Sequence, residues 1–96
     1  MSENARIETG FLLRKLQEGE NLSLPHSRPM PDIGNACHEL RVKDENKEWR
    51  LFYFVDSDAE AIVVLGVEEK KTRTTPKRTI KTCQDRLKSY EDVKAH

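Results

Sequence analysis

The sequence predicts a small α+β domain in which an antiparallel sheet of at least three strands is packed by an N-terminal and a C-terminal helix. Three observations favour this fold class. Apolar residues recur at helical spacing near both ends of the chain, they recur at strand spacing in its middle, and polar turns separate the strand-like segments. A chain of 96 residues has room for one domain, so we expect residues 1–96 to form a single unit.

The first element is an amphipathic helix over residues 3–18. Its apolar side chains follow one another at helical intervals: Ile7, Phe11, Leu12 and Leu16. Ser2 is a suitable N-cap, and Gly19 is a suitable stop. Residues 20–36 then hold three of the four prolines, which interrupt both helices and sheet ladders, so this segment is predicted to be a long loop.

Three strands are expected next, over residues 38–42, 49–55 and 61–67. In the middle strand, alternation places Trp49 and every second residue after it on one face, and Arg50 with Phe52 and Phe54 on the other. The third segment is continuously apolar, which is typical of a central strand that is covered on both faces. The polar connections are short and predict an antiparallel meander.

The end of the chain is basic, although the net charge of the whole chain is zero. Residues 70–88 carry eight Lys or Arg against one acidic residue. A helix is expected over residues 76–91, with Thr75 as N-cap and Pro76 in the first helical position. Its apolar stripe recurs at intervals of three and four residues: Ile80, Cys83, Leu87 and Tyr90. This final helix is therefore amphipathic and basic.

Composition excludes several classes of protein. No apolar stretch is long enough to span a bilayer, and the start lacks the charged and apolar regions of a secretory signal, so we expect a cytoplasmic protein without membrane contact. Cys37 and Cys83 are far apart and are expected to be buried, reduced hydrophobes. No spacing advertises a metal site, and we expect neither a metal nor a cofactor. Only 35% of the residues are hydrophobic, so a partner is expected to contribute stability.

Three segments in this order carry a resemblance to a known family: PHSRPMPDIGNACHELRV, EWRLFYFVD and EKKTRTTPKRTIKTCQDRLKSY. Together they resemble the phage-derived HigB-like branch of the RelE/ParE toxin superfamily, from about Arg6 to Tyr90. The resemblance implies a small RelE-like fold whose helices pack on one side of the sheet and whose other side is a concave basic surface. RelE-type toxins usually begin with a strand that is missing here, so we expect an open sheet edge that can pair with another chain as a dimer.

The resemblance implies a toxin of a type II toxin–antitoxin system, an endoribonuclease that cuts mRNA in the ribosomal A site. Its expected partners are the ribosome with its mRNA and an antitoxin of the helix-turn-helix type. Two alternatives stay open. One is a non-catalytic, protein-binding module with the same fold, and the other is a gyrase poison like those of the ParE branch.

Cleavage of RNA through its own 2′-OH needs a base, an acid and cations around the phosphate. We expect Arg41 and Arg50 to hold the phosphate, and Lys70 and Lys71 to act as base or charge stabiliser. The expected contacts to the RNA backbone are Arg73, Lys77 and Arg78. Arg50 in particular is predicted to be an exposed side chain that contributes little to folding.

Other readings of these residues are less specific. Arg41 and Arg50 can instead form ordinary surface ion pairs with Glu39 or Glu48. The basic segment can be a solvated helix face. His38 has the chemistry of a general acid or base, although a single histidine at a strand edge is more often only a hydrogen-bonding surface residue.

Overall fold

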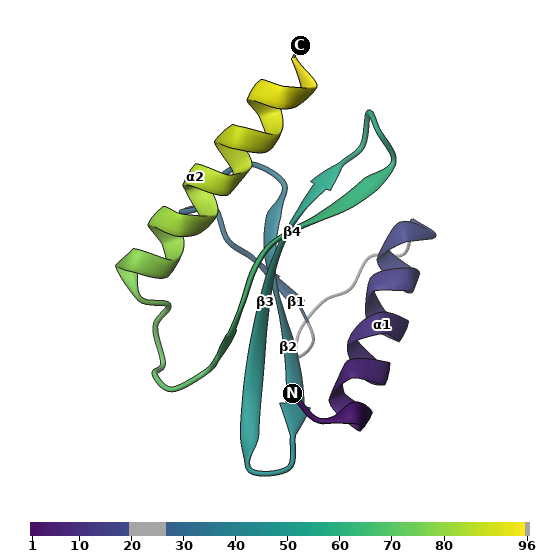
Figure 1. The fold of residues 1–96 in the computed structure, drawn as a ribbon, viewed down its shortest axis with the longest axis vertical. Coiled ribbons are helices and arrows are strands. Elements are labelled where there is room, and N and C mark those ends of the chain that lie inside the picture. Colours follow the sequence, from purple (N-terminus) through teal and green to yellow (C-terminus); the bar gives the residue numbers. More distant parts are fainter. Residues whose placement is uncertain (20–26, 96) are drawn as a thin grey trace.

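The computed structural model describes residues 1–19 and 27–95. There, a four-stranded antiparallel sheet lies between two helices (Figure 1). The elements are α1 (Glu3–Gln17), β1 (Ser27–Pro29), β2 (Cys37–Asp44), β3 (Lys47–Asp56), β4 (Ala61–Glu69) and α2 (Lys77–Lys94). The α+β class is confirmed, with a helix at each end and more than three strands in the sheet.

The sheet is a meander in the order β1-β2-β3-β4, and β1 corrects the expectation of an uninterrupted loop over residues 20–36. Ser27 pairs with Leu40, and Pro29 pairs with His38. Proline is tolerated here because β1 is an edge strand and needs no amide donor on its outer side. The Ser27 hydroxyl also bonds the Tyr53 hydroxyl at 2.7 Å. The remainder of the expected loop that precedes β1, residues 20–26, lies outside the described residues.

The apolar strand β4 lies at the other edge of the sheet, not at its centre as its sequence predicted. Val64 and Val67 are 46% and 50% exposed. The register shifts by one residue between Phe52 and Tyr53 of β3, so Leu65 has no direct partner and turns inward. The predicted central position is therefore wrong, but β4 is covered on both faces as expected: Leu65 and Val63 pack in the core beside α2, and Ile62 packs in the core beside α1.

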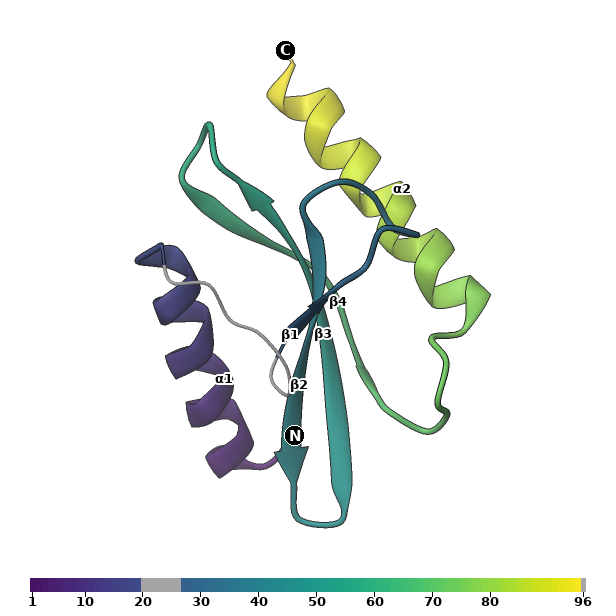
Figure 2. The same cartoon turned by 180° about the vertical axis from the view of Figure 1, so that it is seen from behind.

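The two helices cover opposite faces of the sheet (Figures 1 and 2). The alternation of β3 separates two cores, as predicted for its two faces. Leu51 and Tyr53 pack with residues of α1, whereas Phe52 packs with Cys83 and Leu87 of α2. The expectation that both helices pack on one side is therefore wrong. Each face of β3 carries apolar side chains over part of its length, so each face must be buried by a helix of its own.

The buried face of helix α1 matches the predicted stripe in part: Leu12 and Leu16 pack in the core as expected. Ile7 and Phe11 are exposed, and Ala5, Thr9 and Leu12 are buried. Small residues allow the helix to lie close to the sheet, and the Thr9 hydroxyl is satisfied by the Ala5 carbonyl at 2.7 Å. Ser2 is the N-cap, as predicted, and its side chain accepts from the Ala5 amide.

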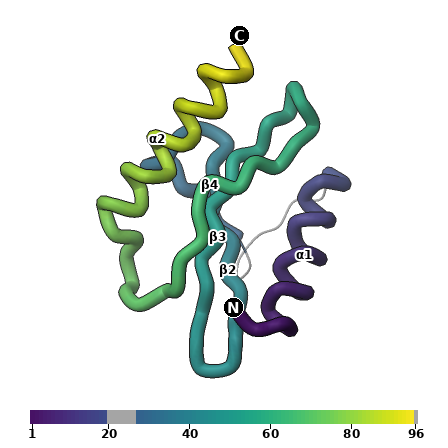
Figure 3. The backbone as a smooth tube through the Cα atoms, viewed as in Figure 1, coloured from purple at the N-terminus to yellow at the C-terminus, as the bar shows by residue number. Residues whose placement is uncertain are grey.

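Helix α2 follows a long connection after β4 (Figure 3). Pro76 itself is the N-cap, so the prediction that Thr75 caps this helix is wrong. The predicted apolar stripe is confirmed, with Ile80, Cys83 and Leu87 in the core. Tyr90 packs edge-on against Phe54.

Both cysteines are free and buried, as expected. Burial is the main cause that raises the pKa of Cys37 to about 11, and it also raises the pKa of Cys83. In the part of the chain that the structure describes, no helix is long and apolar enough to cross a membrane.

Candidate functional site

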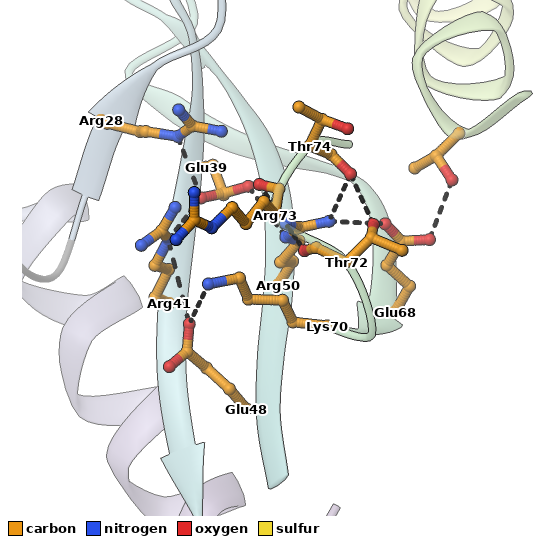
Figure 4. A network of polar contacts seen from close by, with 11 residues as sticks. Arg28, Glu39, Arg41, Glu48, Arg50, Glu68, Lys70, Thr72, Arg73 and Thr74 are labelled. Atoms are coloured by element: carbon orange, nitrogen blue, oxygen red, sulfur yellow. Dashed lines mark hydrogen bonds and ion pairs between the residues drawn. The ribbon is translucent and has the colours of Figure 1, made fainter. Parts of the chain in front are cut away.

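Charged side chains occupy the part of the α2-side face that borders the β4–α2 connection (Figure 4). Strand pairing brings them together. Arg28 of β1 is opposite Glu39 of β2, and Arg41 of β2 is opposite Arg50 of β3. Arg50 is opposite Glu68 of β4 in turn. Apolar side chains occupy the other part of this face, against α2.

Glu39 lies at the centre of this network and is completely buried. Its Oε1 accepts from Nε of Arg41 at 2.8 Å and from Nε of Arg28 at 3.1 Å. Burial by itself would raise the pKa of this carboxyl group, but the hydrogen bonds and charges of Arg41 and Arg28 outweigh it and hold the pKa below its ordinary value. Glu39 is therefore an ionised anchor that orients two guanidinium groups.

Arg50 is the third cation at this anchor, and it is 1% exposed. Its Nε lies 3.3 Å from Glu39 Oε2, within ion-pair distance but without hydrogen-bond geometry. Its Nη2 donates to the carbonyls of Thr72 at 2.7 Å and Arg73 at 3.1 Å, and its Nη1 reaches the carbonyl of Thr74 at 3.5 Å. Arg50 thus holds the connection against the sheet.

This arrangement corrects the prediction for Arg50. The alternation of side chains along β3 correctly predicted that Arg50 lies on the face opposite Trp49. The expected exposure is wrong, because residues 72–74 fold back over the guanidinium group and take up its donors. An arginine whose donors all point at protein groups has no free edge for a phosphate. Its role in the structure is to position other groups.

Four cations remain accessible around this anchor, and we call them the cationic cluster: Arg28, Arg41, Lys70 and Arg73. The side chains of Arg28 and Arg41 are 37% and 28% exposed. Among the described residues, neither arginine uses its Nη groups in a hydrogen bond. The paired Nη edges therefore face outward in a fixed orientation.

Lys70 is held by Glu48. Its Nζ lies 3.4 Å from Glu48 Oε1, and its backbone amide donates to the Glu48 carbonyl at 2.7 Å. The same carboxylate oxygen lies 4.0 Å from Nε of Arg41. Glu48, Lys70 and Arg73 line an open hollow of about 550 Å³ beside the β2–β3 turn. In Figure 4 the Arg73 side chain extends from the connection towards the strand that carries Arg41.

The other predicted site residues lie further out. Lys71 is exposed at the rim of the hollow, with Nζ 3.9 Å from Glu69. Lys77 and Arg78 are exposed in the first turn of α2, and no side-chain contact joins them to the cationic cluster within residues 1–19 and 27–95. His38 stacks on Tyr53 on the face covered by α1, away from the cluster.

Sequence reasoning missed Arg28, Glu39 and Glu48 as members of the site. Arg28 lies in the proline-rich segment, where no strand was expected, so its pairing with β2 had no local signal. Glu39 and Glu48 were considered only as surface ion-pair partners. Their even spacing from Arg41 and Arg50 along the strands does place all four on one face.

The described residues contain no group of three or more His, Cys, Asp or Glu side chains that could hold a metal ion. What the geometry offers is a set of guanidinium and ammonium donors held by two carboxylates, Glu39 and Glu48. Such donors recognise phosphate oxygens, and arginine in particular does so through two parallel bonds.

In a comparison with protein families, residues 1–88 match a model described as phage derived protein Gp49-like. Those residues include every strand and the whole charged network. No curated protein and no solved structure matches the chain. Because the family model covers most of its length, the chain belongs to the phage-derived Gp49-like family, whose members are RelE-like and toxin-like.

Proposed function

We propose that this protein is a HigB-like toxin of a type II toxin–antitoxin system, and that it cuts mRNA on the ribosome. The observation that carries the proposal is the cationic cluster, in which buried Glu39 aims the free edges of Arg28 and Arg41 outward. The family match supports a toxin-like module. The cluster supplies the phosphate-binding cations that an RNA-cleaving member needs.

The roles follow from the contacts. Arg28 and Arg41 bind the non-bridging oxygens of the scissile phosphate and neutralise the charge that grows there during attack by the 2′-OH. Their orientation is set before RNA arrives, since Glu39 already holds both Nε atoms. Lys70 adds positive charge beside Arg41, and Arg73 holds the RNA backbone at the edge of the hollow.

Glu48 is our candidate for the group that accepts the 2′-OH proton. Its carboxylate lies between Lys70 and Arg41 beside the hollow, with Oε1 buried against these two cations. The side chain as a whole is 27% exposed, and this exposed part is what RNA can reach. This assignment leaves Lys70 as a charge stabiliser, one of the two roles expected for it. Replacement of Glu48 by Gln keeps the size of the side chain and removes the base, and it is expected to slow cleavage by roughly 10²–10⁴-fold.

A ribosome-dependent cleavage assay tests the proposal. The purified protein is mixed with ribosomes carrying a defined mRNA, and cleavage is mapped by primer extension. The wild-type chain is expected to cut within the A-site codon, and Arg41→Ala is expected to lower the rate on the order of 10²–10³-fold. Arg6→Ala is the matched control, because Arg6 is exposed on α1, on the other side of the sheet.

The alternatives have distinct outcomes. Harmless expression without the neighbouring gene, together with no cleavage, would refute an endoribonuclease and favour a binding module. DNA damage with intact mRNA would favour a gyrase poison. The antitoxin partner is tested by co-purification with the product of the adjacent gene, which is expected to protect the ribosome-bound mRNA.

A further inference from the structure

The outer face of α1 carries two large apolar side chains that belong to neither core cluster of the described residues. Ile7 is 64% exposed and Phe11 is 56% exposed. They lie four residues apart and therefore occupy one side of the helix, one turn above the other. Between them Gly10 is exposed and has open space around it, so another backbone can approach closely. This face points away from the sheet, which α1 contacts through Ala5 and Leu12.

Charge is arranged unevenly along the same helix. Glu3 lies in the first turn, and Arg14 and Lys15 lie in the last turn. None of the three forms an ion pair within the described part of the chain. Lys15 instead places its Nζ 4.7 Å from the centre of the Phe11 ring, which brings positive charge to the edge of the apolar stripe. On the outer face, Glu3 thus lies at one end of the apolar pair and Lys15 at the other. Further exposed charges of both signs lie along the same helix: Arg6, Glu8 and Glu18.

From this pattern we propose that two copies of this chain pair through the outer faces of α1, with the helices antiparallel. If the pair is centred on residue 9, Ile7 of one copy lies opposite Phe11 of the other, and Glu3 lies opposite Lys15. Two-fold symmetry makes each contact twice. A parallel pair would instead bring like charges together at both ends.

The pairing surface is separate from the cationic cluster. Helix α1 covers one face of the sheet and the cluster lies on the other, so both copies present their clusters to solvent in the paired state. The proposal therefore stands whether or not the chain cleaves RNA. It also differs from pairing through a sheet edge, because no strand is involved.

Sedimentation velocity on the full chain, from about 1 µM to about 1 mM, tests the pairing. Two facing helices bury little surface, so we expect a weak, concentration-dependent dimer. Phe11→Glu is expected to weaken it at least about tenfold. Val93→Glu is the control, because Val93 is an even more exposed apolar residue on α2, at 76%, and its replacement is expected to leave the dimer unchanged. Circular dichroism verifies that each variant is folded.

Charge reversal tests the antiparallel arrangement. Glu3→Lys and Lys15→Glu each place like charges opposite one another, so each variant alone is expected to dimerise more weakly than the wild type. An equimolar mixture of the two restores both opposite-charge contacts and is expected to recover dimers at wild-type strength. A monomer at every concentration, a dimer that persists in Phe11→Glu, or a mixture no stronger than either variant alone would each overturn the proposal. If the chain is a monomer at every concentration, the outer face of α1 would instead be a candidate binding site for a different protein.

Discussion

Arg41 and Arg50 face each other across β2 and β3, and both contact Glu39. We nevertheless expect removal of Arg50 to lower mainly stability and removal of Arg41 to lower mainly catalytic activity. The perturbation is the same in both positions, truncation of an arginine to alanine. The two sites differ in burial. The Arg50 side chain is 1% exposed and contacts three carbonyl groups, whereas the Arg41 side chain is 28% exposed and uses only its Nε.

The expected magnitudes follow from these contacts. Removal of one partner from a buried ion pair typically costs about 3–5 kcal/mol, because the remaining charge loses its compensation. For a domain of this size that loss lowers Tm by roughly 15–30 °C. Arg41→Ala is expected to cost less, about 1–3 kcal/mol, since Glu39 loses one charge-assisted hydrogen bond and keeps Arg28 and Arg50.

Catalytic activity, in contrast to stability, should depend directly on Arg41. Arg41→Ala removes a group that is free to meet the phosphate, so cleavage is expected to fall on the order of 10²–10³-fold while the fold persists. The assay combines a thermal melt by circular dichroism with the ribosome-dependent cleavage reaction, both on the same preparation and below the lower Tm. An Arg50→Ala protein that melts within a few degrees of the wild type would refute our account of the buried network. So would an Arg41→Ala protein that is equally destabilised.

Three further outcomes are expected. Lys71→Ala removes an exposed cation at the rim of the hollow and should reduce the slope of log affinity for RNA against log salt by about one unit, as measured by fluorescence anisotropy. Hydrogen bonds from Lys94, at 2.8 Å, and from Tyr90 lower the pKa of Asp56 to about 2, so its stabilisation is complete above about pH 4 and is lost as the pH falls towards 2. Lys94→Met should therefore shift acid unfolding to higher pH, and an unchanged midpoint would contradict this. Because the cysteines are buried and their thiol pKa values are raised, both should react with a thiol reagent at pH 8 only after denaturant is added.

The elements that could be predicted are those with a local signal. Both helices and two of the strands have a periodic pattern of apolar residues, a third strand is a continuous apolar run, and the structure contains each of them close to its expected range. Strand β1 has three residues in a proline-rich segment, and its pairing partner is about ten residues away. No local pattern encodes such a contact.

Part of the candidate site was also predictable. Arg41, Lys70 and Arg73 were expected to act together. In the structure Arg41 contacts the buried carboxylate of Glu39, and Lys70 and Arg73 line one hollow. Lys77 and Arg78 were expected to join them and do not. Arg28 was missed, because it reaches Glu39 only through the pairing of β1 with β2.

By itself, the sequence determined the fold class, the face of the sheet on which Arg50 lies and the concentration of positive charge after β4. These properties depend on residues close together in the chain, through the periods of helix and strand and through local composition. Tertiary structure decided which of those residues are accessible. Arg50 is buried because the connection at residues 72–74 folds over it, Ile7 and Phe11 are exposed because small residues bring α1 against the sheet, and β4 is an edge because no fifth strand pairs with it among the described residues. Each of these outcomes depends on segments that meet only when the chain packs, and burial is a property of that packing.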